Sequence, residues 1–457
     1  MVSIRTRLDR IKDDPAELIN PEIVERACHD ARYCWRDRTL DPLTTLGAFA
    51  AQIAHGNTAI AHVVGLLSQR GVECSESAYC QARARLPVSV VRAVFDDFTT
   101  RVRGASKPSD GLWHGHRTVL IDGTGVSTPD SPELRKTFGV RTNCGRGAGL
   151  PLIQTLAIFD AHDGLLLDLH LAPMNTQDLR HAHELHPSLE PGDVLVGDRA
   201  FASYIHLHRL ASMGCHGVLR IGSSWKVPFP ARKGARRPLA YNRHRRHEPV
   251  LVEFINKDDQ VIEIVKPHNR PDSITPEEFA KVPAKMVVRT VRYRVEGKGA
   301  RSREVTLLTT LVDAKKYPAK DLAELYGTRW RIEVNLRHLK RTMGMERLKC
   351  QSVEGVKREM FMFALIYNAV CHVRVQAAKA QGVEPTRVSF IDTLRAVIRC
   401  EESVATRTAD PPVLKVWPNR KPRTHPRLLK HSHSTFQILR QPRADAVKAL
   451  NKNKTTN

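Results

Sequence analysis

The pattern of apolar and polar positions divides the chain into a helical beginning and a longer part that mixes strands with helices. Over residues 1–105, apolar side chains recur at helical spacing between residues that cap or break helices. Asp41 and Ser75 are placed to cap helices, Gly71 to end one, and Pro87 to break another. We therefore predict a helical N-terminal domain over 1–105. The polar positions expected on its exposed face are Ser77, Gln81, Arg83 and Arg85.

After a turn-rich linker at 104–111, short apolar runs alternate with helical patterns. Strands are predicted over 117–127, 150–164, 165–173, 193–201 and 215–222, and helices over 176–189 and 203–214. A turn at Asp163–Gly164 joins the second strand to the third. This order predicts an α/β sheet of mixed direction, which forms the first part of a core domain over 106–222.

The pattern changes again at 223–312, which opens with an arginine- and proline-rich run and continues with alternating β-type segments. We predict a β-rich insertion there. The core then resumes over 313–385, with an amphipathic helix around 326–340 and a second core helix over 353–382. The remaining residues, 386–457, form a basic C-terminal region. From Asp410 onward, eleven Lys and Arg against two acids, with many prolines, predict a basic, weakly ordered tail.

The amphipathic helix, "YGTRWRIEVNLRHLK", places one carboxylate among positive charges. At about 100° per residue, one stripe holds Tyr326, Arg329, Glu333, Arg337 and Lys340. The neighbouring apolar stripe consists of Leu325, Ile332, Leu336, Leu339 and Met343. In one interpretation Glu333 only pairs with Arg329 and Arg337 at i,i+4 spacing, which stabilises a helix by a few tenths of a kcal/mol. In the other, Glu333 is a metal ligand on a surface that binds phosphates.

Charge favours a polyanionic partner. The chain has 72 Lys and Arg against 48 Asp and Glu, a formal net charge of +24 and a pI of about 9.9. Nucleic acid is the natural partner, and an anionic membrane surface is the competing one. With no run of 18 apolar residues and no apolar core in the first 14 residues, we expect a cytoplasmic protein without a membrane span. The helical domain over 1–105 is then either a DNA-binding unit or a plain bundle.

Two other residue types suggest no metal site. None of the nine cysteines forms a C-x-x-C pair, and we expect reduced, buried thiols. "HAHELH", residues 181–186, brings three histidines together, and we expect a surface or partly buried cluster.

Acidic residues at predicted strand ends suggest chemistry instead. Asp122 in "LIDGT" and Asp198 in "GDRAF" each follow an apolar strand, where open α/β folds build sites. Asp160 and Asp163 are alternatives, but their turn-like context explains them. Two such aspartates with Glu333 suit two divalent ions ~3.5–4 Å apart. Carboxylates are the ligands that Mg²⁺, or Mn²⁺, prefers.

These motifs together resemble a known family. Tyr326, Arg329, Glu333 and Lys340 match the Y-x2-R-x3-E-x6-K signature of the insertion-sequence-four (IS-four) DDE transposases. "LIDGT" and "GDRAF" resemble that family's two aspartate motifs, and the resemblance covers about 70–385. It implies a ribonuclease H-like catalytic core with a mostly β insertion before the glutamate. It also implies that Asp122, Asp198 and Glu333 bind the metal ions, while Tyr326, Arg329 and Lys340 hold DNA phosphates.

We therefore predict a transposase that cuts double-stranded DNA at the ends of its insertion sequence and joins the 3′-hydroxyl ends to target DNA by two-metal phosphoryl transfer. Holding two ends together implies a homodimer on DNA, in the bacterial cytosol. A non-catalytic DNA-binding descendant and a structure-specific nuclease are the alternatives. Further phosphate contacts are expected from Arg337 and from the basic run of the insertion, namely Arg236, Arg237, Arg245 and Arg246.

Overall fold

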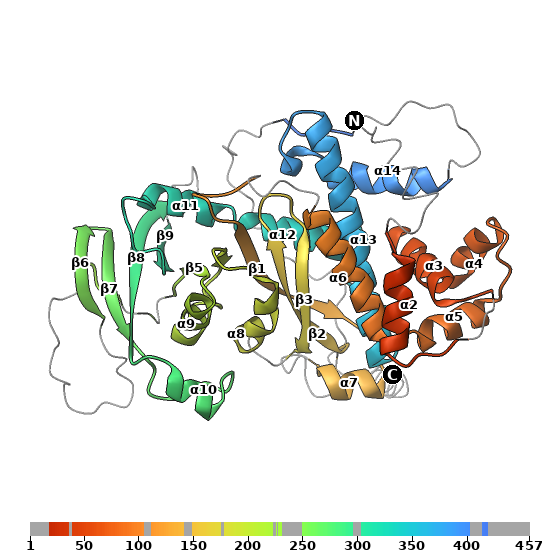
Figure 1. The fold of residues 1–457 in the computed structure, drawn as a ribbon, viewed down its shortest axis with the longest axis horizontal. Helices are drawn as coiled ribbons and strands as arrows, with labels where there is room; N and C mark the ends of the chain where they lie inside the picture. Colours follow the sequence, from red (N-terminus) through yellow and green to blue (C-terminus); the bar gives the residue numbers. More distant parts are fainter. Residues whose placement is uncertain are drawn as a thin grey trace, which may run out of the picture.

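A computed structural model gives the fold of the chain (Figure 1). It describes residues 18–35, 39–104, 111–140, 149–174, 178–222, 225, 227–230, 249–295, 303–402 and 414–418. A nine-stranded sheet crosses the molecule, helices cover its two faces, and a group of helices from the N-terminal part lies at one end. The predicted mixed α/β class is confirmed.

The N-terminal part is helical as predicted. It contains α2 (Pro21–Asp30), α3 (Pro42–Ala54), α4 (Ile60–Ser68), α5 (Glu76–Arg85) and α6 (Val88–Gly104). Asp41 caps α3 by accepting from the Thr44 amide at 2.6 Å, and Ser75 caps α5 through the Ala78 amide at 3.1 Å. The prediction that Arg83 is exposed was wrong, because its guanidinium packs over the Phe49 ring, 4.9 Å from the centroid.

Five strands form the half of the sheet that carries the aspartates. They are β1 (Thr118–Ser127), β2 (Leu152–Asp160), β3 (Leu166–Pro173), β4 (Val194–Gly197) and β5 (His216–Arg220). Their order is β3-β2-β1-β4-β5, with β2 antiparallel to both neighbours and β1, β4 and β5 parallel. The predicted turn joins β2 to β3. There Asp160 accepts from the His162 amide and Asp163 from the Leu165 amide, each at 2.8 Å.

The strands of the predicted β-rich segment extend this same sheet. They are β6 (Val250–Asn256), β7 (Asp259–Val265), β8 (Lys285–Val295) and β9 (Arg303–Thr309), with α10 (Pro276–Lys281) between β7 and β8. β9 pairs antiparallel with β5, and the order continues outward as β8, β7 and β6. A buried ion pair fixes this half, since Arg289 donates to Asp259 at 2.6 and 2.8 Å. The run 231–248 lies outside the described residues.

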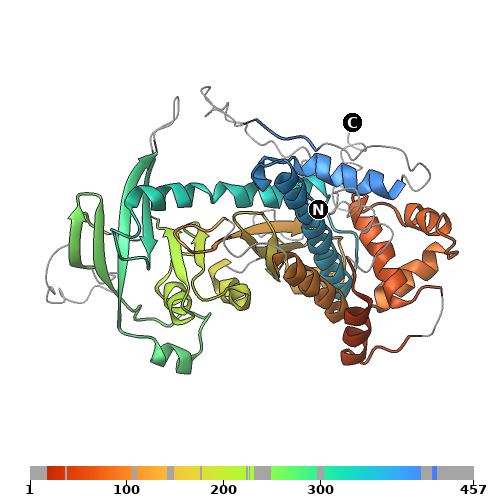
Figure 2. The ribbon, with the colours of Figure 1, turned by 45° about the horizontal axis from the view of Figure 1, so that its top comes forward.

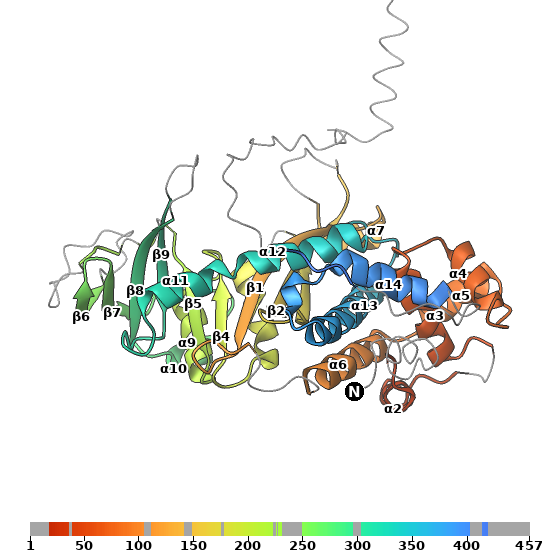
Figure 3. The ribbon, with the colours of Figure 1, turned by 90° about the horizontal axis from the view of Figure 1, so that it is seen from above.

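Helices cover both faces. One layer holds α8 (Asp178–His181), η3 (Ala182–Ser188) and α9 (Tyr204–Ser212), and the other holds α11 (Ala319–Gly327), α12 (Trp330–Arg337) and α13 (Val353–Ala380). Figure 3 shows α11 and α12 on one side of the strands and α9 on the other. The predicted helix over 176–189 is instead a single α-turn followed by a 3₁₀-helix, which contains Pro187. The smaller helices are α7 (Pro132–Phe138), η5 (Pro385–Arg387) and α14 (Phe390–Glu402).

The core helix α13 packs along α6, and Figure 2 shows the two side by side. By length and apolar composition α13 could cross a membrane, but 83% of its most apolar window is buried inside the protein. Asn368 at its centre is fully buried and bonds to the backbone of Leu166 in β3 and to Thr99 of α6. The predicted core helix is therefore confirmed, and it ties the N-terminal helices to the sheet.

Candidate active site

Asp122 and Asp198 lie side by side on the face of the sheet that α12 covers. The parallel register places Ile121 opposite Gly197, so Asp122 and Asp198 are the next residues on the two strands. A side chain at Gly197 would contact Phe201 and Leu219 on the face away from α12. Because side chains alternate along a strand, the next residue, Asp198, points to the face that α12 covers. Asp122 is not at the end of its strand as predicted, because residues 123–127 continue β1 along β2. Only the pairing with β4 stops there.

Glu333 reaches the same place from α12, which packs on β1. Ile332 and Leu336 of this helix are buried, as the predicted apolar stripe requires. Arg331 also anchors the helix, since its Nη1 donates to the carbonyl oxygen of Ala161 at 2.8 Å. The packing thus aims Glu333 at the sheet.

Arg329 lies between these acids. Its Nη2 donates to Glu333 Oε1 at 2.7 Å, and its Nη1 lies 3.5 Å from Asp122 Oδ2. The side chains of Arg329, Asp122 and Glu333 are 20%, 21% and 34% exposed, so this group sits at a partly buried opening. The interpretation of Glu333 as an ion-pair partner is confirmed for Arg329, and its role as a metal ligand stays a prediction. Glu333 does pair with Arg329 at i,i+4 spacing, and it also converges with a strand aspartate that is distant in sequence.

The surroundings of Asp122 change its acidity. Its pKa is raised to about 6, chiefly by burial and in addition by the negative charges of Asp198 and Glu333. The Gly123 amide, which donates to Asp122 at 2.8 Å, and the positive charge of Arg329 oppose this rise. Asp198 and Glu333 thus disfavour the charged form of Asp122, and the guanidinium of Arg329 partly offsets this effect.

A tyrosine and a second arginine border the acids. Tyr326 is buried at the end of α11, and burial raises its pKa, while Arg329 and Arg220 lower it and Asp198 raises it. Arg220 ends β5 on the same face as Asp198 and also acts on Tyr293 of β8. Arg220 was missed from the sequence, because only the strand order places it beside the aspartates.

The predicted continuous helix over 326–340 is interrupted twice. α11 ends at Gly327 and α12 begins at Trp330, with Ile332 bonding to the Arg329 carbonyl in a tighter turn. A π-helical turn, η4 (His338–Thr342), then holds Lys340, and such turns are frequent at functional sites. Arg337 is exposed in the last turn of α12.

Trp330, at the start of α12 and 45% exposed, is a further residue that the sequence motif did not single out. The predicted phosphate-contacting residues of the insertion, Arg236, Arg237, Arg245 and Arg246, lie outside the described residues.

No ready-made metal cage is present in the described part of the chain, where no three His, Cys, Asp or Glu side chains form a metal-binding group. Arg329 lies between two of the candidate acids, Asp122 and Glu333. Of the histidines of "HAHELH", His181 and His183 are partly buried as expected, but the expectation was wrong for His186, which is buried and stacks on His206. The described cysteines are free thiols, but only Cys28, Cys215 and Cys371 are buried.

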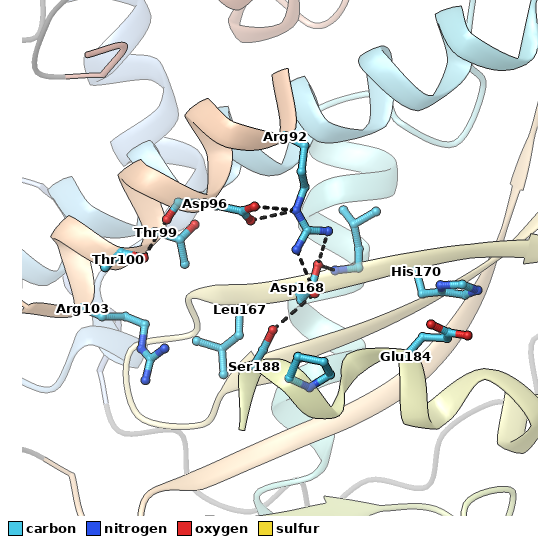
Figure 4. Close-up of a pocket in the computed structure, with 12 residues that line it drawn as sticks. Arg92, Asp96, Thr99, Thr100, Arg103, Leu167, Asp168, His170, Glu184 and Ser188 are labelled. Atoms are coloured by element: carbon cyan, nitrogen blue, oxygen red, sulfur yellow. Dashed lines mark hydrogen bonds and ion pairs between the residues drawn. The ribbon is translucent and has the colours of Figure 1, made fainter. Parts of the chain in front are cut away.

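A cavity of about 500 Å³ between α6 and β3 contrasts with this site (Figure 4). Arg92 at its wall donates to Asp96 at 2.8 Å and pairs with Asp168 at 2.9 Å. Ser188 donates to Asp168 as well, at 3.2 Å. Arg92 is matched by two carboxylates of its own chain, and Arg103 at the same cavity pairs with Glu190, so both arginines already have acidic partners.

Acids from two adjacent strands and a facing helix, bordered by arginines, are typical of enzymes that act on phosphodiesters. Comparison with known proteins gives the family. The family model "Transposase DDE domain" matches residues 113–369, which is more than half of the chain. The chain belongs to this family of transposases, and the resemblance predicted from its motifs is confirmed.

Two relatives from Escherichia coli (strain K12) align with the chain. Transposase InsG for insertion sequence element IS4 is 26% identical over 326 residues, which is 71% of this chain and 66% of the relative. The putative transposase InsZ is 30% identical over 143 residues, 31% of this chain and 48% of that relative. The aligned part is slightly under two thirds of the first relative and about half of the second.

One solved structure also aligns, a piggyBac transposase synaptic complex with hairpin DNA. The match covers 90% of this chain and 83% of that one, with 11% identity and a TM-score of 0.46. This likeness is too distant to assign a fold or a function.

Proposed function

We propose that the chain is the transposase of an insertion sequence, which cuts double-stranded DNA at the element's ends and joins the 3′-hydroxyl ends to target DNA. The observation that carries this proposal is the convergence of Asp122 and Glu333 on Arg329, with Asp198 beside Asp122 on the neighbouring strand, in a protein of the DDE family. The strand order β3-β2-β1-β4-β5, with β2 alone antiparallel, supports a ribonuclease H-like core.

Asp122, Asp198 and Glu333 fit a divalent ion by their chemistry. All three offer hard carboxylate oxygens, which suit Mg²⁺ or Mn²⁺, and a cationic guanidinium already lies against two of them. When bound, such ions activate the attacking oxygen and stabilise the leaving oxygen of the phosphodiester. For all three acids to serve as ligands, Arg329 has to leave its position between Asp122 and Glu333.

A DNA phosphate supplies the reason for Arg329 to move. Its guanidinium can bind a phosphate through two parallel hydrogen bonds, which would replace its hydrogen bond to Glu333 at 2.7 Å and its 3.5 Å contact with Asp122. Tyr326 and Arg220 border the acids, and we expect them to hold neighbouring phosphates together with Arg337 of α12 and Lys340 of η4. Substrate binding would thus clear the acids for the metal ions.

The remaining regions are assigned by position. We propose that 1–105 binds element ends, that 106–222 and 313–385 form the catalytic core, that 223–312 is its insertion, and that 386–457 adds basic charge. Because both element ends must be held together, we propose a homodimer on DNA in the bacterial cytosol.

The test replaces each acid by its amide: Asp122→Asn, Asp198→Asn and Glu333→Gln. Each variant should lose cleavage of duplex DNA that carries the element's end, with Mg²⁺ present, but still retard that DNA in a gel. Asp130→Asn is the control, since Asp130 pairs with Arg135 at the surface and should stay active. Near-normal cleavage by any amide variant would remove that acid from the site. Cleavage by the wild type without joining would identify a nuclease instead.

A further inference from the structure

A second cavity, of about 420 Å³, lies where the N-terminal helices meet the beginning of α13. Three positive charges lie at its wall: Arg83 of α5, Lys349 from the segment before α13, and Arg358 of α13. Apolar Phe49 and Ile60 lie beside them. No acidic side chain is among its described lining residues. The wall is built from segments far apart in the sequence, and none of these residues belongs to the candidate active site.

Among the described residues, the hydrogen-bond partners of the three cations are all neutral. Arg358 is 7% exposed, and its Nη1 donates to the carbonyl oxygen of Leu86 at 2.8 Å. Arg83 Nη1 donates to the amide oxygen of Gln52 at 2.7 Å. The Lys349 ammonium donates to the backbone carbonyl of Asn57.

Two acids nearby have other partners. Glu359 is buried and accepts from the Asn57 amide at 2.6 Å and from the backbone amides of Lys349 and Cys350. Glu354 forms an ion pair with Lys357 at 2.8 Å. Neither carboxylate makes a hydrogen bond to Arg358 in the described part of the chain.

A buried guanidinium without a carboxylate partner is costly, because burial removes water from a charge that only neutral groups then solvate. Burial lowers the pKa of Arg358, and the positive charge of Arg83 lowers it further, while the Cys350 thiol and Glu354 oppose both effects. Arg92 in the cavity of Figure 4 shows the contrast, since two carboxylates balance it. The cavity at Arg358 therefore has a positive charge that an external anion would balance.

We propose that this cavity binds a phosphate group, held by Arg83 and Arg358 with Lys349 at the rim. Guanidinium groups suit phosphate because their planar N–H pairs match two of its oxygens. The segment 344–350 leads from the turn that holds Lys340 directly to this cavity, so the DNA backbone is the source that its position favours. Inorganic phosphate shares the same chemistry. The inference needs no metal ion at the acids and stands apart from the catalytic proposal.

The first experiment measures the melting temperature of the full chain in sodium phosphate and in sodium chloride of equal ionic strength at pH 7. Phosphate at ten times its dissociation constant should raise the melting temperature of the wild type by roughly 2 °C. Arg358→Gln should lose this rise and melt no lower in chloride, because the substitution removes the repulsion from Arg83.

Two further variants keep the outcome interpretable. Lys349→Gln changes an exposed residue at the rim, removes its hydrogen bond to the Asn57 carbonyl, and should weaken the rise. Arg92→Gln is the matched control. It breaks a balanced pair, so it should melt lower yet keep the full phosphate response. An absent rise in the wild type, or an unchanged rise in both Arg358→Gln and Lys349→Gln, would overturn the proposal.

The second experiment separates the two sources with a 20-base-pair duplex of arbitrary sequence. If the DNA backbone fills the cavity, saturating duplex should abolish the additional rise caused by phosphate. Arg358→Gln should then lower the slope of log affinity against log salt by about 0.9, the value of one phosphate contact. If the duplex leaves the phosphate response and the slope unchanged, the cavity takes free phosphate.

Discussion

Replacing Arg329 by lysine separates a role on DNA from a role within the helix. Arg329 now contacts Glu333 at 2.7 Å and approaches Asp122 to 3.5 Å, and lysine can keep the closer of these pairs. Both side chains of the closer pair are partly exposed, so the pair contributes well under about 1 kcal/mol to stability. The melting temperature of Arg329→Lys should therefore stay within about 1 °C of the wild type.

The DNA cleavage rate of Arg329→Lys should fall even though its melting temperature is unchanged. Lysine keeps the charge but loses the planar pair of donors that binds a phosphate, and hydrogen bonds to charged groups contribute about 1.5–3 kcal/mol. At 1.4 kcal/mol for each factor of ten, cleavage of end-bearing DNA should fall by roughly 10- to 100-fold. Single-turnover cleavage with saturating Mg²⁺ measures this rate, and differential scanning fluorimetry measures the melting temperature.

Arg331→Lys is the control for this substitution. Arg331 is two residues further along and donates to the Ala161 carbonyl, away from the acids. Its replacement should leave the rate near that of the wild type. Equal rates for Arg329→Lys and the wild type would refute the proposed DNA contact. A loss of rate that appears together with a fall of several degrees in melting temperature would do so as well, because it would indicate misfolding.

Three other substitutions test the fold and its charge. Arg289→Met leaves Asp259 buried without its partner, so the free energy of unfolding, measured in urea, should fall by about 3–5 kcal/mol. A fall below about 1 kcal/mol would contradict the buried pair. The pKa of His186 is lowered to about 3 and that of His206 to about 4, chiefly by burial, so both histidines stabilise the fold when neutral. The free energy of unfolding should be complete above about pH 6.5 and fall as the pH drops towards 4. His206→Gln should flatten this pH dependence. Neutralising three arginines of the basic run 231–247 should reduce the dependence of DNA affinity on salt, by about 0.9 log unit per lost phosphate contact, and an unchanged slope would exclude these contacts.

Local features of the chain were predictable because they depend on neighbouring residues. Asp41 and Ser75 cap helices through amides three residues ahead, and the Asp160–Asp163 turn satisfies its own backbone. The apolar stripe that buries Ile332 follows from helical spacing alone. The motif around Glu333 indicated the family for a similar reason, since its spacing is read along one short segment.

Contacts between distant segments were decided only by the tertiary structure. The sequence shows Asp122, Asp198 and Glu333 as separate acids, and packing of α12 on β1 brings Arg329 between two of them. Arg220 joins this site because β5 follows β4 in the sheet, and the β-rich segment extends the sheet because β9 pairs with β5.

Arg83 illustrates the physical reason most directly. Helical periodicity marks it as exposed, but α3 lies against that side of α5, and stacking on Phe49 with a hydrogen bond to Gln52 outweighs hydration. Periodicity determines which side chains share a face of an element. The packing of the elements decides which faces are covered. It also decides which charges then have only neutral partners, as Arg358 does with the Leu86 carbonyl in the described part of the chain.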